Sequence, residues 1–348
     1  MRIWFNRHFA LVARVIRQLR DATPALPVTA VISHRHSHFV GFAEADEAFV
    51  EPAGLAPEDY LQWCLDIAGR RRIEYLVPGH EQSLLTANAA AFMKLGCRII
   101  HAAPMDTLPL LHRKDWVYEN CAHLVELPPY RVVTEPEQLA GAVAALERDE
   151  LDEVCIKPCV SVYGKGFGRI TGRAERAGAE RDHVEHWLAR NVREGRCAPQ
   201  LVMQFLPGSE YSVDIAARDG ELLAAVVRRK PTSGTGQLLQ HNPLLVEAAR
   251  RLVAHFKLNA MVNVQFRDDP AGLSRLLEIN PRASGGIGMS CLSGINLPDI
   301  AIRAALSANY AVPPLTPRLG VRVAEVPRAV IVPEGEPDAL PAGDARAA

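Results

Sequence analysis

Hydrophobic residues in the first hundred positions alternate between short runs and helical spacings. Residues 2–6 and 28–32 are apolar runs typical of buried strands. The segment between them has apolar side chains at the spacing of one helix face: Leu11, Val12, Val15, Ile16 and Leu19. The same order continues with a helix at 57–69, a strand at 75–77, an alanine-rich helix at 82–95 and a strand at 98–100. This alternation predicts a Rossmann-like parallel sheet covered on both faces. The GxGxxG fingerprint of dinucleotide folds is absent, because the first expected strand is followed by FNRHFA.

The pattern changes near residues 104–109, where a helix starting near Lys114 leads into expected hairpins. Asp-Gly at 219–220 and the segment RDDPAG at 267–272 are turn signals. Between them, Asn242 and Pro243 are the N-cap and first-turn proline of another expected helix. We therefore expect a first domain at 1–108, a small subdomain at 109–202, a C-terminal subdomain at 203–325 and a flexible tail at 326–348.

Polar residues alternate in the segment LLEINPR, residues 276–282. Alternate side chains of a strand share a face, so Glu278, Asn280 and Arg282 are expected to converge, with Leu277 and Ile279 behind them. Gln265, in the partner segment AMVNVQF, can face the same side. One carboxylate and two amide oxygens suit Mg²⁺ that arrives with a polyphosphate. A solvated edge hairpin is the alternative interpretation.

Two further segments have features of nucleotide sites. Lys157 ends an apolar run and is followed by SVYGKGFGRI, in which Gly164, Lys165 and Gly166 could cover phosphate oxygens. The spacing is not that of a Walker A loop. The connector in QFLPGSE could pair with an adenine edge, with Glu210 near a ribose. Each segment alone is equally compatible with an ordinary loop or turn.

The order of these segments resembles the ATP-grasp superfamily, in particular the synthetase half of the carbamoyl phosphate synthetase large subunit and biotin carboxylase-like ligases. The matching features are Lys114, Lys157 with its glycine loop, QFLPGSE, NVQF and EINPR. The resemblance implies a mixed α/β and α+β protein. Its expected parts are a Rossmann-like pre-ATP-grasp domain and a two-part ATP-grasp fold that closes on ATP with Mg²⁺, or Mn²⁺ in its place.

The resemblance also implies roles for individual residues. Arg282 would be catalytic, and the sequence itself adds Arg228 and Lys230 as further catalytic candidates. Gln265, Glu278 and Asn280 would bind the metal. The nucleotide contacts would be Lys114, Lys157, Gly164, Lys165, Gly166, Gln204, Phe205, Leu206 and Glu210. Backbone N–H groups at Ser284, Gly285 and Gly286 would hold a carboxylate or phosphate.

The implied reaction phosphorylates a carboxylate with ATP and joins the acyl phosphate to an amine, forming a C–N bond and ADP. One alternative is a carbamoyl-phosphate-synthase-like kinase that acts on bicarbonate or carbamate. Another is an ATP-binding sensor or assembly component without turnover. The chain reads Gly234-Thr235-Gly236 where carbamoyl phosphate synthetases have His-Thr-Gly, which weakens the bicarbonate interpretation.

Three other polar segments have two interpretations each. The cations at 228–230 could bind an acidic substrate or form a solvated strand end. His34, His36 and His38 have a spacing that could bind zinc, but a polar loop is preferred. His80 and Glu81 follow an expected parallel strand, so they are candidates for substrate contact, with helix capping as the alternative for Glu81.

Composition limits the partners. The net charge is −1, from 39 Lys and Arg against 40 Asp and Glu, which gives no reason to expect nucleic acid or a membrane surface. The seven cysteines are scattered without a CxxC pair, so we expect a reducing cytoplasm and structural cysteines. The expected partners are a small-molecule carboxylate and an amine, and the resemblance adds a homodimer as an expectation.

Overall fold

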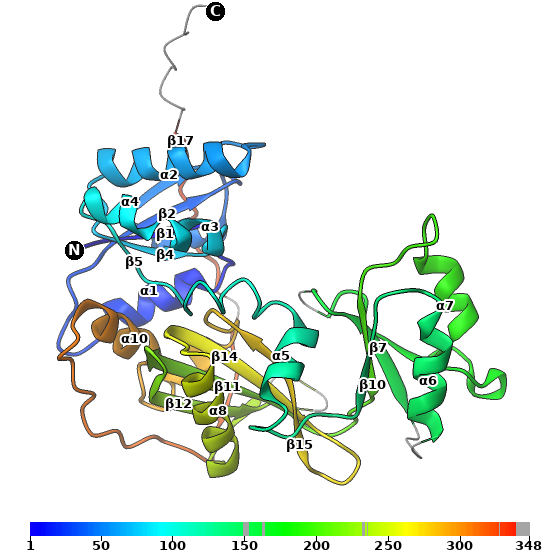
Figure 1. Ribbon diagram of the computed structural model, residues 1–348. Helices are drawn as coiled ribbons and strands as arrows, with labels where there is room; N and C mark the ends of the chain where they lie inside the picture. The colour runs from blue at the N-terminus through cyan, green and yellow to red at the C-terminus, as the bar shows by residue number, and fades with distance from the viewer. Residues whose placement is uncertain (149–152, 162–163, 232–233, 235, 327, 339–348) are drawn as a thin grey trace, which may run out of the picture.

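The computed structural model describes residues 1–148, 153–161, 164–231, 234, 236–326 and 328–338. These residues form three β-sheets (Figure 1). The first sheet, with its helices, lies above the third in this view, and the second lies to one side. The mixture of parallel and antiparallel sheets confirms the expected fold class. Within the described ranges, no helix is both long and apolar enough to cross a membrane.

The first sheet is parallel throughout, with the order β17-β3-β2-β1-β4-β5. Its strands are β1 (Arg2–Asn6), β2 (Thr29–His34), β3 (Glu47–Val50), β4 (Tyr75–Pro78), β5 (Arg98–Ile99) and β17 (Glu336–Pro337). Its helices are α1 (Val12–Arg20), η1 (Val40–Glu44), α2 (Pro57–Arg70), α3 (Gln82–Ala87) and α4 (Ala89–Lys94). Ile3 and Phe5 pack with α1, whereas Trp4 packs with α2, so strand alternation buries both faces.

The second sheet has the order β6-β10-β7-β8-β9. Its strands are β6 (Tyr130–Val133), β7 (Val154–Pro158), β8 (Gly168–Thr171), β9 (Asp182–His183) and β10 (Gln200–Gln204). One face carries α6 (Gln138–Arg148) and α7 (Val184–Asn191), and η2 (Ala174–Arg176) lies between β8 and β9. Val154 and Ile156 pack under these helices. The alternate residues Cys155 and Lys157 therefore point away from the helices.

The third sheet has the order β15-β14-β11-β12-β13-β16 and is antiparallel. Its strands are β11 (Glu210–Arg218), β12 (Glu221–Arg229), β13 (Gln237–Gln240), β14 (Ala260–Asp268), β15 (Ser274–Asn280) and β16 (Arg322–Val323). The associated helices are α5 (Lys114–Cys121), α8 (Pro243–His255), α9 (Ile287–Cys291) and α10 (Leu297–Leu306). Val213 and Ile215 pack with α8, so the next positions on β11, Ser212 and Asp214, belong to the opposite face.

Several expected elements are confirmed. The strand at 2–6 coincides with β1, α2 begins at the expected Pro57, and Asp219 and Gly220 join β11 to β12. The side chain of Asn242 caps α8 by accepting a hydrogen bond from the backbone N–H of Leu245 at 3.1 Å.

The expected helix at 82–95 is wrong as one element, because it divides into α3 and α4 at Asn88. The Asn88 amide donates to the carbonyl of Leu84 at 2.9 Å, a local bond that competes with helix geometry. The short strand β3 had no counterpart among the expected elements.

The expectation of a flexible tail is wrong at residues 336–338. Strand β17 pairs with β3, and the carboxylate of Asp338 forms ion pairs with Arg70 at 2.8 Å and Arg71 at 2.6 Å. Sequence reading missed this because the apolar content of the segment is low, and its order comes from pairing and charge. Residues 339–348 lie outside the described residues.

Candidate active site

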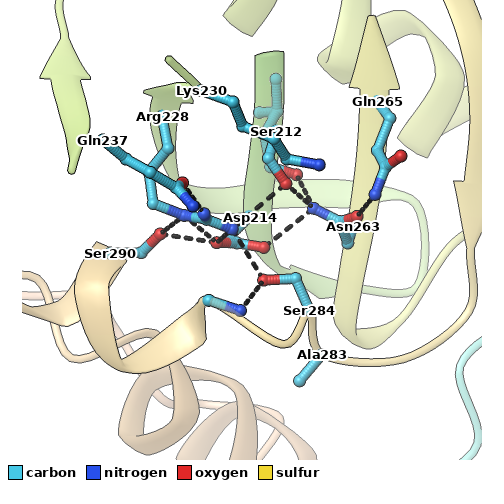
Figure 2. Close-up of polar contacts among 12 residues, drawn as sticks. Ser212, Asp214, Arg228, Lys230, Gln237, Asn263, Gln265, Ala283, Ser284 and Ser290 are labelled. Atoms are coloured by element: carbon cyan, nitrogen blue, oxygen red, sulfur yellow. Dashed lines mark hydrogen bonds and ion pairs between the residues drawn. The ribbon is translucent and has the colours of Figure 1, made fainter. Parts of the chain in front are cut away.

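Two rows of polar side chains cross the third sheet on the face opposite α8. The backbone register aligns Arg228, Ser212, Gln265 and Glu278 on neighbouring strands. The second row aligns Asp214, Asn263 and Asn280. Figure 2 shows how the members on β11, β12 and β14 point toward one another. The third sheet therefore brings Gln265, Glu278 and Asn280 to one face, as the sequence predicted.

A β-bulge on β15 changes the expected place of Leu277. Glu278 pairs with Gln265 and Leu276 pairs with Phe266, so Leu277 is the extra residue. Leu276 is fully buried, whereas Leu277 lines the same pocket as Glu278. The expectation that Leu277 lies behind the polar face is therefore wrong, because the bulge interrupts the strand's period of two.

A pocket with a cavity volume of about 430 Å³ opens between the second and third sheets. This volume lies within the usual range for small-molecule sites. Its lining includes most of the expected nucleotide contacts: Lys114, Lys157, Gly164, Phe205, Leu206 and Glu210. Lys230, Gln265, Glu278, Arg282, Ser284 and Gly285 line it as well. Residues separated by more than 150 positions thus meet in one cavity.

Two of the three lysines that line this pocket, Lys114 and Lys157, are buried and lie near carbonyl or carboxylate oxygens. Lys114 Nζ lies 3.8 Å from Glu278 Oε2 and donates to the carbonyl of Ser161 at 3.1 Å. Lys157 Nζ lies 3.5 Å from the carbonyl of Leu277 and 5.8 Å from the ring centre of Tyr118. Burial lowers the pKa of Lys114 and lowers the pKa of Lys157 to about 8. Negatively charged phosphate oxygens near these two lysines would stabilise their protonated, cationic forms.

ADP binding in the absence of metal is expected to weaken as the pH rises above about 8. Protonated Lys157 attracts phosphate, and its pKa of about 8 means that the free protein loses this charge above that pH. Binding then requires proton uptake, so the affinity falls by up to about tenfold per pH unit. Isothermal titration of ADP in EDTA buffers between pH 6.5 and 9.5 measures this dependence.

Lys157→Arg is the matched control, because a guanidinium stays protonated over this range. Its ADP affinity should change less with pH than that of the wild type. A wild-type affinity that stays constant from pH 7 to 9.5 would contradict a phosphate contact by Lys157.

The connector between the second and third sheets lies along one side of the pocket. Phe205 and Leu206 line the cavity, whereas Gln204 ends β10 and is not among the lining residues. Arg169 and Arg267 lie 4.9 and 5.8 Å from the ring centre of Phe205. Glu210, the expected ribose contact, forms an ion pair with Lys230. A ribose hydroxyl would have to compete with that pair.

The glycine-rich loop reaches the pocket at Gly164. Lys165 and Gly166 are exposed and lie outside the lining residues. Gly166 has φ +78°, and a Cβ there would lie 2.7 Å from Pro158, so this turn requires glycine. The phosphate role of these loop residues stays a prediction.

A second pocket adjoins the first. The two share Lys114, Ser161, Glu278 and Arg282. Ile279 and Asn280 of β15 also line the second pocket, and its other walls come from the first sheet and its following loops: Phe9, Gly79, His80, Glu81, Gln82, Ser83, Leu111 and His112. Burial lowers the pKa of both His80 and His112. The sequence-predicted pair His80 and Glu81 therefore lies where a second small molecule would meet the first pocket.

Glu81 precedes α3 but its side chain forms no capping hydrogen bond, so the capping alternative is not supported. Its backbone has φ +50°, which is unusual for a residue other than glycine. Backbone strain of this kind is frequent at functional sites.

The three predicted metal ligands lie together at the hairpin of β14 and β15. Gln265, Glu278 and Asn280 provide one carboxylate and two amide groups on neighbouring strand positions. In the described part of the chain, no cluster of three His, Cys, Asp or Glu residues is arranged for a metal. Asn280 donates to Glu278 at 2.8 Å and accepts from Arg282 at 3.2 Å. The set fits a Mg²⁺ that brings phosphate oxygens and displaces these contacts.

Arg228 was predicted to be catalytic, and the structure contradicts a direct contact with substrate. Its side chain is only 2% exposed and its guanidinium bonds to Asp214 at 2.9 Å (Figure 2). The strand-end pattern RRK indicated three solvent-facing cations, but the carboxylate partner lies 14 positions earlier on β11. Lys230 does reach the pocket.

Sequence reasoning also missed Ser212, Asp214 and Asn263. The signal was present, because SVD on β11 and NVQ on β14 have the same polar-apolar-polar alternation as EIN on β15. Three neighbouring strands with this pattern place six polar groups on one face.

The segment with His34, His36 and His38 was expected to be a polar loop, and the seven cysteines were expected to be structural. Nδ1 of His34 accepts from the backbone N–H of His36, and the ring of His34 stacks on Phe39 at 4.0 Å, as expected for a loop. All seven cysteines have free thiols. Cys155 lines the first pocket, but burial raises its pKa to about 12, so it remains a thiol. Thr235, in the Gly-Thr-Gly connector, lies outside the described residues.

Residues 196–329 match the family described as "ATP-grasp in the biosynthetic pathway with Ter operon". The matched segment includes β10 to β15 and therefore the polar rows. Over this segment, the chain is similar to an ATP-grasp family.

Solved structures are similar in fold to most of the chain. The biotin carboxylase domain of 2-oxoglutarate carboxylase from Hydrogenobacter thermophilus matches with a TM-score of 0.65 and 16% identity, over 89% of this chain and 70% of that one. N5-carboxyaminoimidazole synthetase from Staphylococcus aureus, complexed with ADP, matches with a TM-score of 0.66 and 12% identity, over 92% and 80%. L-amino acid ligase from Bacillus licheniformis matches with a TM-score of 0.59 and 12% identity, over 88% and 74%.

The sequence is also similar to part of carnosine synthase 1 of Gallus gallus. The two are 32% identical over 130 residues, which is 34% of this chain and 14% of that protein. The chain thus matches a small part of the relative's length, and the relative's activity is not transferred by this match.

Proposed function

We propose that the chain is an ATP- and Mg²⁺-dependent ligase that converts a carboxylate to an acyl phosphate and joins it to an amine. The observation that carries this proposal is the junction of the two pockets. Glu278, Arg282 and Lys114 line both cavities. A nucleotide in one pocket and an acid in the other would therefore meet at the same carboxylate and the same two cations.

The nucleotide half of the proposed reaction uses the first pocket. Lys114 and Lys157 hold the phosphates, and the backbone near Phe205 faces the base. Bound at Gln265, Glu278 and Asn280, Mg²⁺ would offset the negative charge of the phosphate oxygens. A carboxylate oxygen of the acid attacks the γ-phosphorus, and the bond from this phosphorus to the ADP oxygen breaks. Arg282 stabilises charge on the phosphoryl oxygens.

The second half uses groups of the second pocket. The amine nitrogen attacks the acyl carbon, and phosphate leaves with the electron pair of the broken C–O bond. The attacking amine must lose a proton. His80 and His112 are held neutral near pH 7 because burial lowers their pKa, so either imidazole can accept that proton.

The names of the similar proteins support an ATP-dependent synthetase or ligase as the reaction class. They include a synthetase in complex with ADP, an L-amino acid ligase and a carnosine synthase. We propose a small-molecule acid and amine as substrates, and a homodimer as the assembly, since one of the similar structures is a domain dimer.

The test is release of ADP and phosphate with ATP, Mg²⁺ and a panel of carboxylates and amines. ADP formation that requires both an acid and an amine is the expected result. AMP and pyrophosphate as the sole nucleotide products would contradict the mechanism.

Product analysis without amine separates the alternatives. Accumulation of an acyl phosphate, or of carbamoyl phosphate from bicarbonate, would indicate a kinase. Tight ATP binding without turnover over the whole panel would indicate a sensor.

A further inference from the structure

The buried ion pair between Asp214 and Arg228 lies at one end of the two polar rows, where Arg228 ends the first row and Asp214 ends the second. Asp214 is fully buried, and it accepts from Arg228 Nε at 3.0 Å and from Asn263 Nδ2 at 2.9 Å. Arg228 also donates to the hydroxyls of Ser212 at 3.1 Å and Ser284 at 2.8 Å (Figure 2). One carboxylate and one guanidinium thus contact groups on both β14 and the loop after β15.

On the β14 side, these contacts determine which way two amides point. The NH₂ group of Asn263 is occupied by Ser212 at 2.8 Å and by Asp214. The oxygen of Asn263 therefore faces Gln265 and accepts from Gln265 Nε2 at 3.1 Å. Because its NH₂ group is used in this way, Gln265 has its carbonyl oxygen, an acceptor, on the side away from Asn263 (Figure 2).

On the loop side, the same pair determines the direction of a hydroxyl. Ser284 Oγ accepts from Arg228 and from the backbone N–H of Gly286 at 3.1 Å. A hydroxyl has two acceptor positions and one donor hydrogen, so both acceptor positions are filled. Ser284 lines the first pocket beside Gly285. Its hydrogen is thus available to an anion in that pocket.

We propose that the Asp214–Arg228 pair determines which hydrogen-bonding groups face the site. It directs the Gln265 oxygen, an acceptor, to a cation and the Ser284 hydroxyl, as a donor, to an anionic group. Asp214 and Arg228 are positioning residues, since neither is among the residues that line the first or the second pocket. The proposal rests on the proposed function for the identity of the cation and the anion. It adds a physical reason for the burial of a charge pair beneath the site.

A double-mutant cycle tests the cation half. Asp214→Asn keeps the shape of the side chain but places an NH₂ group toward Asn263. Asn263 is then expected to reverse, and Gln265 would reverse in turn and direct its NH₂ group at the cation. Mn²⁺ titrated into the ADP-saturated protein should bind at least about tenfold more weakly.

The second variant in the cycle is Gln265→Glu, whose carboxylate has only oxygens to present. In that background, Asp214→Asn should change the Mn²⁺ affinity by less than about threefold. Equal losses in both backgrounds would show a general structural effect and would overturn the proposal. The titration measures binding, so it remains informative even if no substrate pair supports ADP release.

Asp214→Asn removes a buried charge and could prevent folding, so the anion half is tested with neutral substitutions. Ser284→Ala and Ser290→Ala are matched, because each removes a buried hydroxyl that accepts from Arg228 at 2.8 Å. Of the two, Ser284 alone lines the first pocket. The probe is inorganic phosphate titrated into the complex with ADP and Mn²⁺.

Ser284→Ala should weaken phosphate binding at least about fivefold, as expected for loss of a hydrogen bond to a charged group. The loss with Ser290→Ala should be clearly smaller, although both variants should lower the melting temperature. Equal weakening by the two variants, or failure of the wild-type complex to bind phosphate, would contradict the donor role of Ser284.

Discussion

Glu278→Gln is expected to lower the rate of ADP release by at least about 100-fold, since it removes charge at the position where phosphoryl transfer would be stabilised. Glu278 pairs with Gln265 across the hairpin, receives a hydrogen bond from Asn280 and lies 3.8 Å from Lys114. The substituted amide keeps the size of the side chain but loses the negative charge that a cation requires. The measurement is kcat with the best acid and amine pair, combined with Mn²⁺ titration.

Glu210→Gln provides the matched control, because Glu210 is a carboxylate of the first pocket only. It should alter the KM for ATP with a much smaller effect on kcat, as expected for a contact made equally in the ground and transition states. A kcat for Glu278→Gln within about threefold of the wild type would exclude the proposed role of this carboxylate.

Arg228→Ala is expected to lower the free energy of unfolding by about 3–5 kcal/mol, because it leaves the buried carboxylate of Asp214 without its cation. The side chains of both partners are almost completely inaccessible, at 2% and 0% exposure. Chemical denaturation, followed by circular dichroism, measures the change.

Arg251→Ala is the control for loss of an arginine ion pair at the surface. Arg251 and Glu247 are about half exposed and lie one helical turn apart on α8. Exposed pairs of this kind contribute about 0–1 kcal/mol. Similar effects of the two substitutions would mean that Asp214 is protonated or hydrated in the variant.

The strands β1, β2, β4 and β5 and the helices α1 and α2 were predictable because local patterns determine them. Short buried runs such as residues 2–6 and the helix phase of α1 are visible in any window of the sequence. The pairing of β17 with β3 was not predictable in this way, since it joins residues nearly 300 positions apart.

The candidate site shows the same limit. Glu278 and Asn280 were identifiable from alternation on one strand, and Gln265 from its place in the partner strand of the hairpin. The burial of Arg228 depends on Asp214, on the neighbouring strand of the sheet, and no local rule distinguishes a buried cation from a solvated one. The role of Ser161 and His112 as pocket walls depends on how the three sheets are arranged.

The bulge residue Leu277 makes β15 one residue longer and places a carbonyl oxygen near the ammonium group of Lys157. A shorter β15 without this residue could keep the pairs of Gln265 with Glu278 and Phe266 with Leu276. It would lack the carbonyl that lies near both Lys157 Nζ and the Tyr118 hydroxyl. Single-residue deletions at this point are therefore a sharper probe of the cavity than substitutions, because they preserve the ladder while removing one main-chain acceptor.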